Sequence, residues 1–185
     1  MSSCAIKAKL TNPIGVSMPN YPVMFALRDT VSGNGFLAGV TLSGRALVVR
    51  EEDGKWWFYG VRPAAIAESG TTPEEAFLRF RNAYKNLLFD YASDAATFDL
   101  FRHEVESFYQ QPDLEEEANW LEAFRALRSG KAAPEDPFFA SLPKEDPEKR
   151  PAQITVERLD RENSRYTSVD NVPDYVAVPQ MVKAA

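Results

Sequence analysis

The chain has 185 residues, of which 44% are hydrophobic and 12% aromatic, a composition that excludes an intrinsically disordered protein. Its formal net charge of -6 argues against general electrostatic binding to nucleic acid and favours a basic or neutral partner. Cys4 is the single cysteine, so no internal disulfide can form. Residues 1–10 lack the apolar run of a signal peptide, and no stretch approaches the roughly 18 apolar residues of a membrane span. We therefore expect a cytoplasmic protein with no membrane contact.

The first 70 residues predict an antiparallel sheet, because short apolar or alternating runs are separated by turn-forming residues and none has a helical period. The pair of runs at 45–50 and 55–61 is typical of a hairpin, since Asp53 and Gly54 between them supply the positive backbone angles of a tight turn. The predicted strands are 5–10, 21–27, 36–42, 45–50, 55–61 and 64–68.

A helix is predicted to begin at Thr72 and to cover this sheet. Thr72 can cap the free amides, Pro73 suits the first helical position, and Glu75 can close a capping box. Apolar side chains then recur every three or four residues and form one stripe: Phe77, Phe80, Tyr84, Leu87, Leu88 and Tyr91. The pattern indicates an α+β fold, an antiparallel N-terminal sheet covered by this amphipathic helix.

Two further helices are expected after this core. Asp94 is predicted to cap the first, whose apolar residues are Phe98, Phe101, Val105 and Phe108. The second begins near Pro112 and ends at Gly130, and its apolar residues are Leu114, Ala118, Leu121 and Phe124.

The remaining residues predict extended structure. Five prolines indicate a linker over 131–151, which the pair Phe138-Phe139 can anchor. Residues 153–159 are expected to return as a strand, followed by a flexible, extended C-terminal tail whose apolar run at 175–178 can dock. The predicted organisation is a sheet-and-helix core over 1–92, a two-helix extension over 93–130, the linker over 131–151, and the strand with the tail over 152–185.

The residues needed for catalysis are scarce. His103 is the sole histidine, Cys4 lies near the amino terminus, and no phosphate-binding loop or nucleophile elbow is present. We expect no catalytic, cofactor-binding or metal site, and therefore no enzyme and no cofactor. Carboxylates cluster at 51–53 and at 115–117, and convergence of the first cluster with another carboxylate would instead favour a magnesium-dependent nuclease of ribonuclease H-like shape.

The aromatic run 56–59 is the strongest indication of binding. Consecutive strand residues point to opposite faces, so both faces of this strand are aromatic. One face can lie under the helix, and the other needs either the second and third helices or a partner. If a partner binds there, the expected contact residues are Arg50, Glu52, Trp57 and Tyr59. Direct binding of single-stranded nucleic acid is not expected, because the acidic residues 51–53 repel a phosphate backbone.

Residues 44–92 resemble the HicB-like antitoxin domain. A strand with an Asp-Gly turn leads through a short strand ending in glycine to a helix opened by Thr-x-Glu-Glu-Ala, and the matching residues are Gly70, Thr72, Glu74, Glu75 and Ala76. The family's Leu-Pro-Gly turn is replaced here by Val-Arg-Pro-Ala at 61–64. No helical pair follows 153–159, so the DNA binding and autorepression common in the family are not expected.

The resemblance implies a non-catalytic, antitoxin-like or inhibitor-like protein that sequesters a small basic, RNA-cleaving partner and forms a homodimer through its sheet. The acidic charge balance agrees with a basic partner. Besides the nuclease, one alternative stays open: a subunit of a larger phage or mobile-element nucleoprotein assembly, whose proline-rich arm and tail order only against neighbouring chains.

Overall fold

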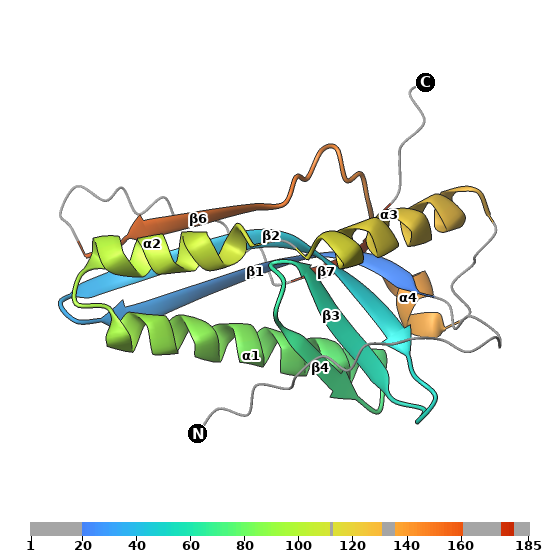
Figure 1. Ribbon diagram of the computed structural model, residues 1–185, viewed down its shortest axis with the longest axis horizontal. Coiled ribbons are helices and arrows are strands. Elements are labelled where there is room, and N and C mark those ends of the chain that lie inside the picture. Colours follow the sequence, from blue (N-terminus) through green and yellow to red (C-terminus); the bar gives the residue numbers. More distant parts are fainter. Residues whose placement is uncertain (1–19, 112, 131–135, 161–174, 180–185) are drawn as a thin grey trace.

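The computed structural model describes residues 20–111, 113–130, 136–160 and 175–179. It has an α+β fold in which a mostly antiparallel sheet forms first and helices follow (Figure 1). This confirms the fold class expected from the sequence. The strand predicted over 5–10 lies outside the described residues. None of the helices in the described ranges is long and apolar enough to span a membrane.

Four consecutive strands form the meander of the sheet: β1 (Tyr21–Gly33), β2 (Phe36–Arg50), β3 (Trp56–Arg62) and β4 (Ala67–Gly70). They pair antiparallel in chain order, and β1 and β2 form a long hairpin that closes at Gly35, whose φ is 72°. The predicted hairpin between β2 and β3 is present, and Gly54 in its turn has a φ of 82°.

The strands predicted separately at 36–42 and 45–50 are one continuous strand, β2. Ser43 and Gly44, which interrupt the apolar pattern, stay in the ladder opposite Ala26 and Phe25. Gly44 is needed there because a Cβ would lie 2.2 Å from the carbonyl oxygen of Arg62 and 2.6 Å from the Phe25 ring. One edge of β2 serves two partners: its first half pairs with β6 (Gln153–Arg158) and its second half with β3. The returning strand predicted at 153–159 is therefore present.

Helix α1 (Pro73–Asp94) begins as the sequence predicts. The Thr72 hydroxyl accepts a hydrogen bond from the Glu75 amide at 3.2 Å, and the Glu75 carboxylate accepts one from the Thr71 amide at 2.7 Å. The residue predicted to cap the next helix, Asp94, instead belongs to the end of α1. Thr97 caps α2 (Phe98–Tyr109) by accepting a hydrogen bond from the Leu100 amide.

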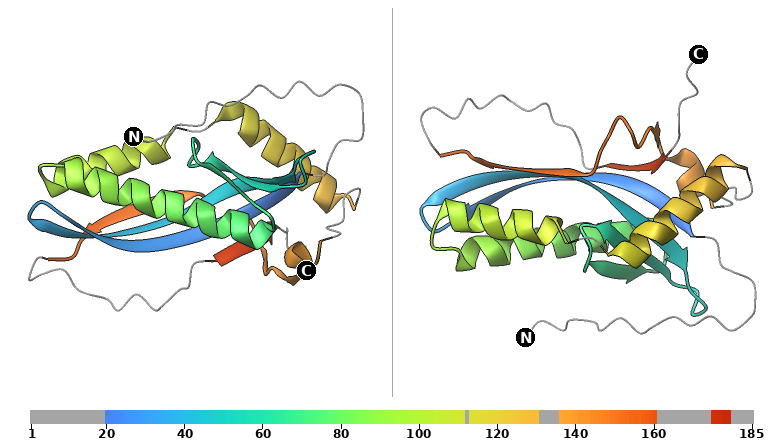
Figure 2. Two further views of the ribbon diagram at one scale, coloured as in Figure 1. Left: turned by 90° about the horizontal axis from the view of Figure 1, so that it is seen from below. Right: turned by 45° about the horizontal axis from the view of Figure 1, so that its top comes forward.

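Helices α1 and α2 lie side by side on one face of the sheet (Figure 2). Phe80 of α1 is fully buried against the rings of Phe25 and Phe58, and Phe101 of α2 is buried against Phe36. The apolar stripe predicted for α1 thus covers the sheet, and burial of each such side chain contributes about 1.5–3 kcal/mol.

Helix α3 (Leu114–Arg128) packs on the opposite face, so that β3 lies between α1 and α3 in Figure 1. Its buried residue is Trp120, which is 1% exposed and packs with Met24, Leu47 and Val61. The apolar positions expected for this helix lie elsewhere: Leu114, Ala118 and Leu121 are exposed, and Phe124 is half-buried. The sequence left open whether α2 and α3 cover the outer face of β3. Helix α3 covers part of it, and α2 lies on the other face of the sheet with α1.

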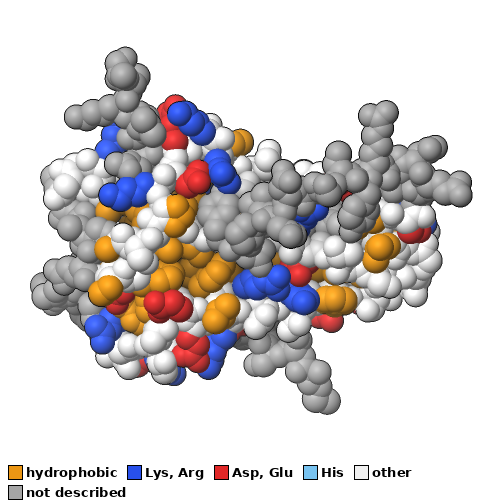
Figure 3. Space-filling model, turned by 180° about the vertical axis from the view of Figure 1, so that it is seen from behind, with side chains coloured by type: hydrophobic (Ala, Val, Ile, Leu, Met, Phe, Trp, Pro, Cys, Tyr) orange, Lys and Arg blue, Asp and Glu red, His pale blue; other side chains and the backbone are white. Residues whose placement is uncertain are grey.

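The predicted linker contains a short helix rather than extended chain alone. In α4 (Pro137–Ser141), Asp136 caps the helix through the Phe138 amide, and Phe139 is buried and stacked on Tyr21 at 4.2 Å. The phenylalanine pair therefore anchors this segment. Beyond it, β5 (Lys144–Glu145) pairs parallel with β7 (Tyr175–Pro179), which adds antiparallel to β1. Figure 3 shows the face behind Figure 1, where hydrophobic and charged side chains are interspersed.

The Tyr84 hydroxyl is buried in this core without a hydrogen-bond partner among the described residues, and this should reduce the stability of the fold. Tyr84 lies on α1 and is 2% exposed. Burial, reinforced by the negative charge of Asp29, raises the pKa of Tyr84. Because an unsatisfied buried hydroxyl costs about 1–3 kcal/mol, we expect Tyr84→Phe to increase the unfolding free energy by about 1 kcal/mol.

Urea denaturation of the two proteins measures this difference. Tyr84→Leu is the matched control: it also removes the hydroxyl but loses the ring, and it should destabilise the protein. A clear loss of stability in Tyr84→Phe would mean that the hydroxyl has an essential acceptor.

Candidate protein-binding surface

The outward face of β3 carries an aromatic pair at the side of α3. Trp57 and Tyr59 are two residues apart in the strand, so they share a face, whereas Trp56 and Phe58 point into the core. The two outward rings stack at a centroid distance of 5.6 Å and an interplanar angle of 10°. Both side chains are half-buried, because α3 covers only the neighbouring part of this face.

The hydroxyl of Tyr59 is held by a carboxylate from the preceding turn. It donates a hydrogen bond to Glu51 Oε1 at 2.5 Å. Burial raises the pKa of Tyr59 well above its ordinary value, and the hydrogen bond to Glu51 and the charges of Glu51, Glu116 and Asp53 raise it further. The phenol is therefore a donor whose oxygen is held in place by Glu51.

Negative charge surrounds the aromatic pair. Glu51 and Asp53 belong to the β2–β3 turn, Glu116 belongs to the first turn of α3, and Glu52 is exposed in the same β2–β3 turn. We call the surface formed by Trp57, Tyr59 and these four carboxylates the β3 outer face. Its charge is suited to a cationic group, which an aromatic ring also attracts through its quadrupole.

The indole nitrogen of Trp57 has no hydrogen-bond partner among the described residues. This atom, Nε1, is covered, although the Trp57 side chain as a whole is half-buried. A buried, unpaired donor costs free energy.

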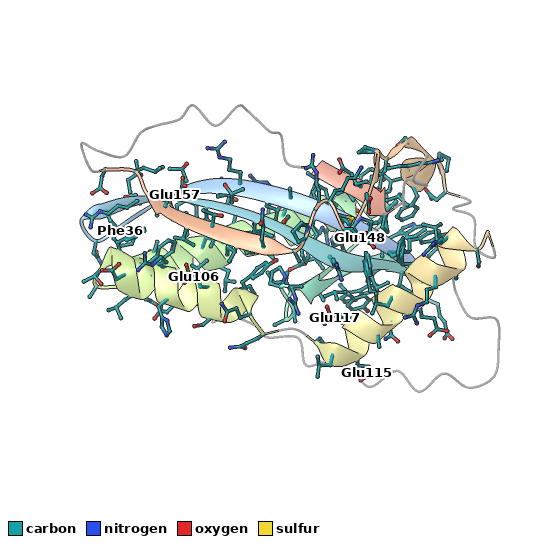
Figure 4. All side chains as sticks on the ribbon, turned by 90° about the horizontal axis from the view of Figure 1, so that it is seen from above. Phe36, Glu106, Glu115, Glu117, Glu148 and Glu157 are labelled. Carbon is teal, nitrogen blue, oxygen red and sulfur yellow. The ribbon has the colours of Figure 1, made fainter. Side chains whose placement is uncertain are left out.

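An ion-pair network positions α3 beside this surface. Arg45 on β2 and Arg62 on β3 lie opposite each other, and Glu117 of α3 lies 3.9 Å from the first guanidinium and 3.6 Å from the second. The guanidinium of Arg45 also lies over the Trp120 ring, 4.7 Å from its centroid. Two arginines in adjacent strands would repel, so Glu117 stabilises both. Figure 4 shows Glu117 on the side of α3 that faces the sheet and Glu115 at the outer end of the helix.

A hydrogen bond completes the attachment of α3. The Trp120 Nε1 donates to the carbonyl oxygen of Val23 at 3.1 Å, a contact between residues 97 positions apart. The ring of Phe124 stacks on Trp120 at 5.5 Å. The helix is thus fixed by one buried indole and by the two arginines beside it.

The structure places three of the four predicted contact residues on the β3 outer face and the fourth on the other side of the sheet. Trp57 and Tyr59 form the stacked pair, and Glu52 is exposed in the turn next to it. Arg50 pairs with Trp56 across the strands, and its guanidinium lies over that ring at 5.8 Å. Because directly opposed residues share a face, Arg50 lies on the other side of the sheet from Trp57.

Three residues of this region were not singled out from the sequence, Arg45, Arg62 and Trp120, and Glu117 was noted only as a member of the acidic cluster 115–117. A tryptophan within a helix rich in charge is a usable signal, because such a residue seldom stays exposed. The sequence does not indicate that Arg45 and Arg62 lie side by side, because they are 17 positions apart and their pairing depends on the register of β2 against β3.

The carboxylate clusters do not converge. Glu51 accepts from Tyr59, Asp53 accepts from the Lys55 amide at 2.9 Å, and Glu117 lies between two arginines. In the ranges that the structure describes, no three His, Cys, Asp or Glu side chains are grouped so as to hold a metal ion. His103 is exposed on α2, and Cys4 lies outside the described residues. The convergence that a magnesium-dependent nuclease requires is absent from these ranges.

Comparisons with known proteins add no family: no protein-family model, no curated protein and no solved structure matches this chain. The HicB-like resemblance of residues 44–92 stays a prediction. The function is therefore inferred from the β3 outer face itself.

Proposed function

We propose that this protein is a non-catalytic binding factor, antitoxin-like or inhibitor-like, that sequesters a small basic protein. The observation that carries the proposal is the β3 outer face, in which a stacked aromatic pair is surrounded by carboxylates. Large aromatic side chains at the centre of a surface and polar groups at its rim are the usual composition of a protein interface.

Rigidity supports this proposal. Trp57 and Tyr59 hold each other by stacking, and the Tyr59 hydroxyl is fixed by Glu51. A partner that binds such a pair has few rotamers to immobilise, so more of the contact energy remains as affinity. Where such an aromatic residue is a binding hot spot, its truncation to alanine reduces the binding free energy by about 2 kcal/mol or more.

Charge supports a basic partner. A lysine or arginine placed over the Trp57 ring would also meet the carboxylates of the turn and of α3. The net charge of -6 attracts such a protein from a distance and speeds its association. If the HicB-like resemblance holds, the partner is an RNA-cleaving toxin, and coverage of its basic RNA-binding surface stops cleavage.

The test captures partners from the native cell on the immobilised full chain and identifies them by mass spectrometry. We expect the wild-type chain to retain one small basic protein and the double variant Trp57→Ala/Tyr59→Ala to lose it. Titration calorimetry with the purified partner should show at least about a tenfold loss of affinity, corresponding to about 1.4 kcal/mol. An RNA-cleavage assay of that partner, with and without this chain, then tests inhibition.

Phe89→Ala is the matched control, because Phe89 is a 40% exposed aromatic residue on α1, which covers the other face of the sheet. It should leave binding unchanged. Equal binding by the wild-type chain and the double variant would contradict the proposal, and so would retention of a large multi-subunit complex in place of a small basic protein.

A further inference from the structure

A second surface of this protein is apolar and lies on α3. Among the described residues, five large hydrophobic side chains are exposed: Leu78, Phe89, Leu100, Leu114 and Leu121. Two of these five belong to α3, where Leu114 is 74% exposed and Leu121 is 36% exposed. Ala118, which lies between them, is also exposed.

These three residues form a stripe that faces away from the sheet. At 100° per residue, Leu114, Ala118 and Leu121 lie about 100–160° around the helix from Trp120, which points into the core. Their spacing of four and three residues continues to Arg125 and Arg128, both exposed. Alternating spacings of four and three are those of a seam between two packed helices.

The charges along the stripe are unevenly distributed. Its N-terminal end carries Glu115 and its C-terminal end carries Arg125 and Arg128, all of them exposed. Glu122, also exposed, lies beside the middle of the stripe, four residues after Ala118. One helix therefore presents an acidic end, an apolar middle flanked by one carboxylate, and a basic end. Such an arrangement is complementary to itself only when two copies run in opposite directions.

We propose that α3 pairs with α3 of a second copy of this chain, antiparallel across a two-fold axis near Ala118. In that arrangement Leu114 of each copy packs beside Leu121 of the other. The small side chain of Ala118 at the crossing lets the helix axes approach to about 8 Å. Arg125 is then level with a point just beyond Leu114, where α3 of the partner copy begins, and Glu115 of that copy lies about 6 Å away along the axis, the rise of four residues.

This pairing is independent of the proposed function. Glu116 and Glu117 of α3 face the sheet side, towards Tyr59 and the arginines, whereas the stripe faces outwards. A dimer through α3 therefore leaves the β3 outer face open. A helix pair of four turns buries less area than a standard protein interface, so the dimer is weak and depends on concentration.

Sedimentation velocity of the full chain tests the proposal, from low micromolar to several hundred micromolar concentration. We expect the mean mass to rise from one chain towards two. Glu115→Arg and Arg125→Glu each place like charges at both ends of the contact, and each should raise the dissociation constant at least about tenfold.

An equimolar mixture of these two variants should dimerise again, because each arginine of one chain then meets a glutamate of the other. Overall charge cannot cause this, since the variants carry -6 + 2 = -4 and -6 - 2 = -8 and repel each other. Glu104→Arg, the same charge change at an exposed position of α2, is the control and should dimerise like the wild type.

Three results would overturn the proposal. The first is a wild-type chain that stays monomeric at the highest concentration. The second is a dimer that the two α3 variants leave intact. The third is a mixture of the variants that remains monomeric, which would exclude the antiparallel arrangement.

Discussion

Trp120→Ala is expected to lower the unfolding free energy by about 3–5 kcal/mol, the usual cost of truncating a buried tryptophan. The ring is 1% exposed, stacks on Phe124, supports the guanidinium of Arg45 and donates a hydrogen bond to Val23. Its loss leaves a cavity between α3 and the sheet and removes the hydrogen bond to the Val23 carbonyl on β1. Guanidinium denaturation, followed by far-ultraviolet circular dichroism, measures the difference.

The matched variant Trp120→Phe separates the two contributions. It keeps an aromatic ring against Phe124 but removes the Nε1 donor, so about 1–2 kcal/mol should be lost. Trp120 is the buried residue of α3 and the main attachment of this helix to the sheet. In hydrogen exchange, Trp120→Ala should therefore reduce the protection of α3 amides more than that of α1 amides. Equal loss of protection in both helices would show that α3 and the sheet unfold as one unit.

Phe80→Ala is expected to have a comparable cost, about 3–5 kcal/mol, through the other face of the sheet. Phe80 is fully buried, and its ring lies 5.1 Å from that of Phe25 and 4.6 Å from that of Phe58. These three rings join α1 to β1 and β3, so the cavity weakens the principal core. Chemical denaturation should show a lower midpoint with an unchanged slope.

Phe80→Leu is the control, since it retains most of the buried volume and should cost less than half as much. Hydrogen exchange in Phe80→Ala should accelerate in α1 and in the central strands together. A cost below about 1 kcal/mol for Phe80→Ala would mean that the site collapses around the smaller side chain and that these rings do not hold α1 on the sheet.

The elements of this fold that depend on local sequence could be predicted. The β2–β3 hairpin follows from Asp53 and Gly54, and α1 begins at Thr72 as its capping residues indicate. The return of 153–158 as a strand and the burial of Phe139 also agree with prediction. Each of these features is decided by a turn, a cap or an apolar run within a few residues.

Two elements were predicted wrongly because a nearby signal was ambiguous. Asp94 has the chemistry of a helix cap, but Thr97 lies closer to the apolar residues of α2 and takes that place. Gly44 looks like an interruption between strands, but it lies inside β2 because its lack of a side chain lets the Arg62 carbonyl approach. Propensity alone does not distinguish these alternatives.

The candidate site was predictable only in part. Alternation along β3 predicted that Trp57 and Tyr59 share one face, and the structure places that face on the side of α3 rather than of α1. The separation of Arg50 from that face and the position of α3 depend on contacts between residues far apart in the chain. The Arg45–Glu117 and Trp120–Val23 contacts are examples.

By itself, the sequence determined the class of fold, the start of its main helix and the two-sided aromatic character of β3, because turns, caps and side-chain alternation act over a few residues. Tertiary structure alone decided that α2 joins α1 on one face, that α3 covers the other with Trp120 inwards, and that Leu114 and Leu121 remain outside. A helix with apolar residues on two sides can bury either one. The side that goes inwards is the one whose shape, charges and hydrogen-bond donors find partners on the assembled sheet, and these partners exist only once β1, β2 and β3 have paired.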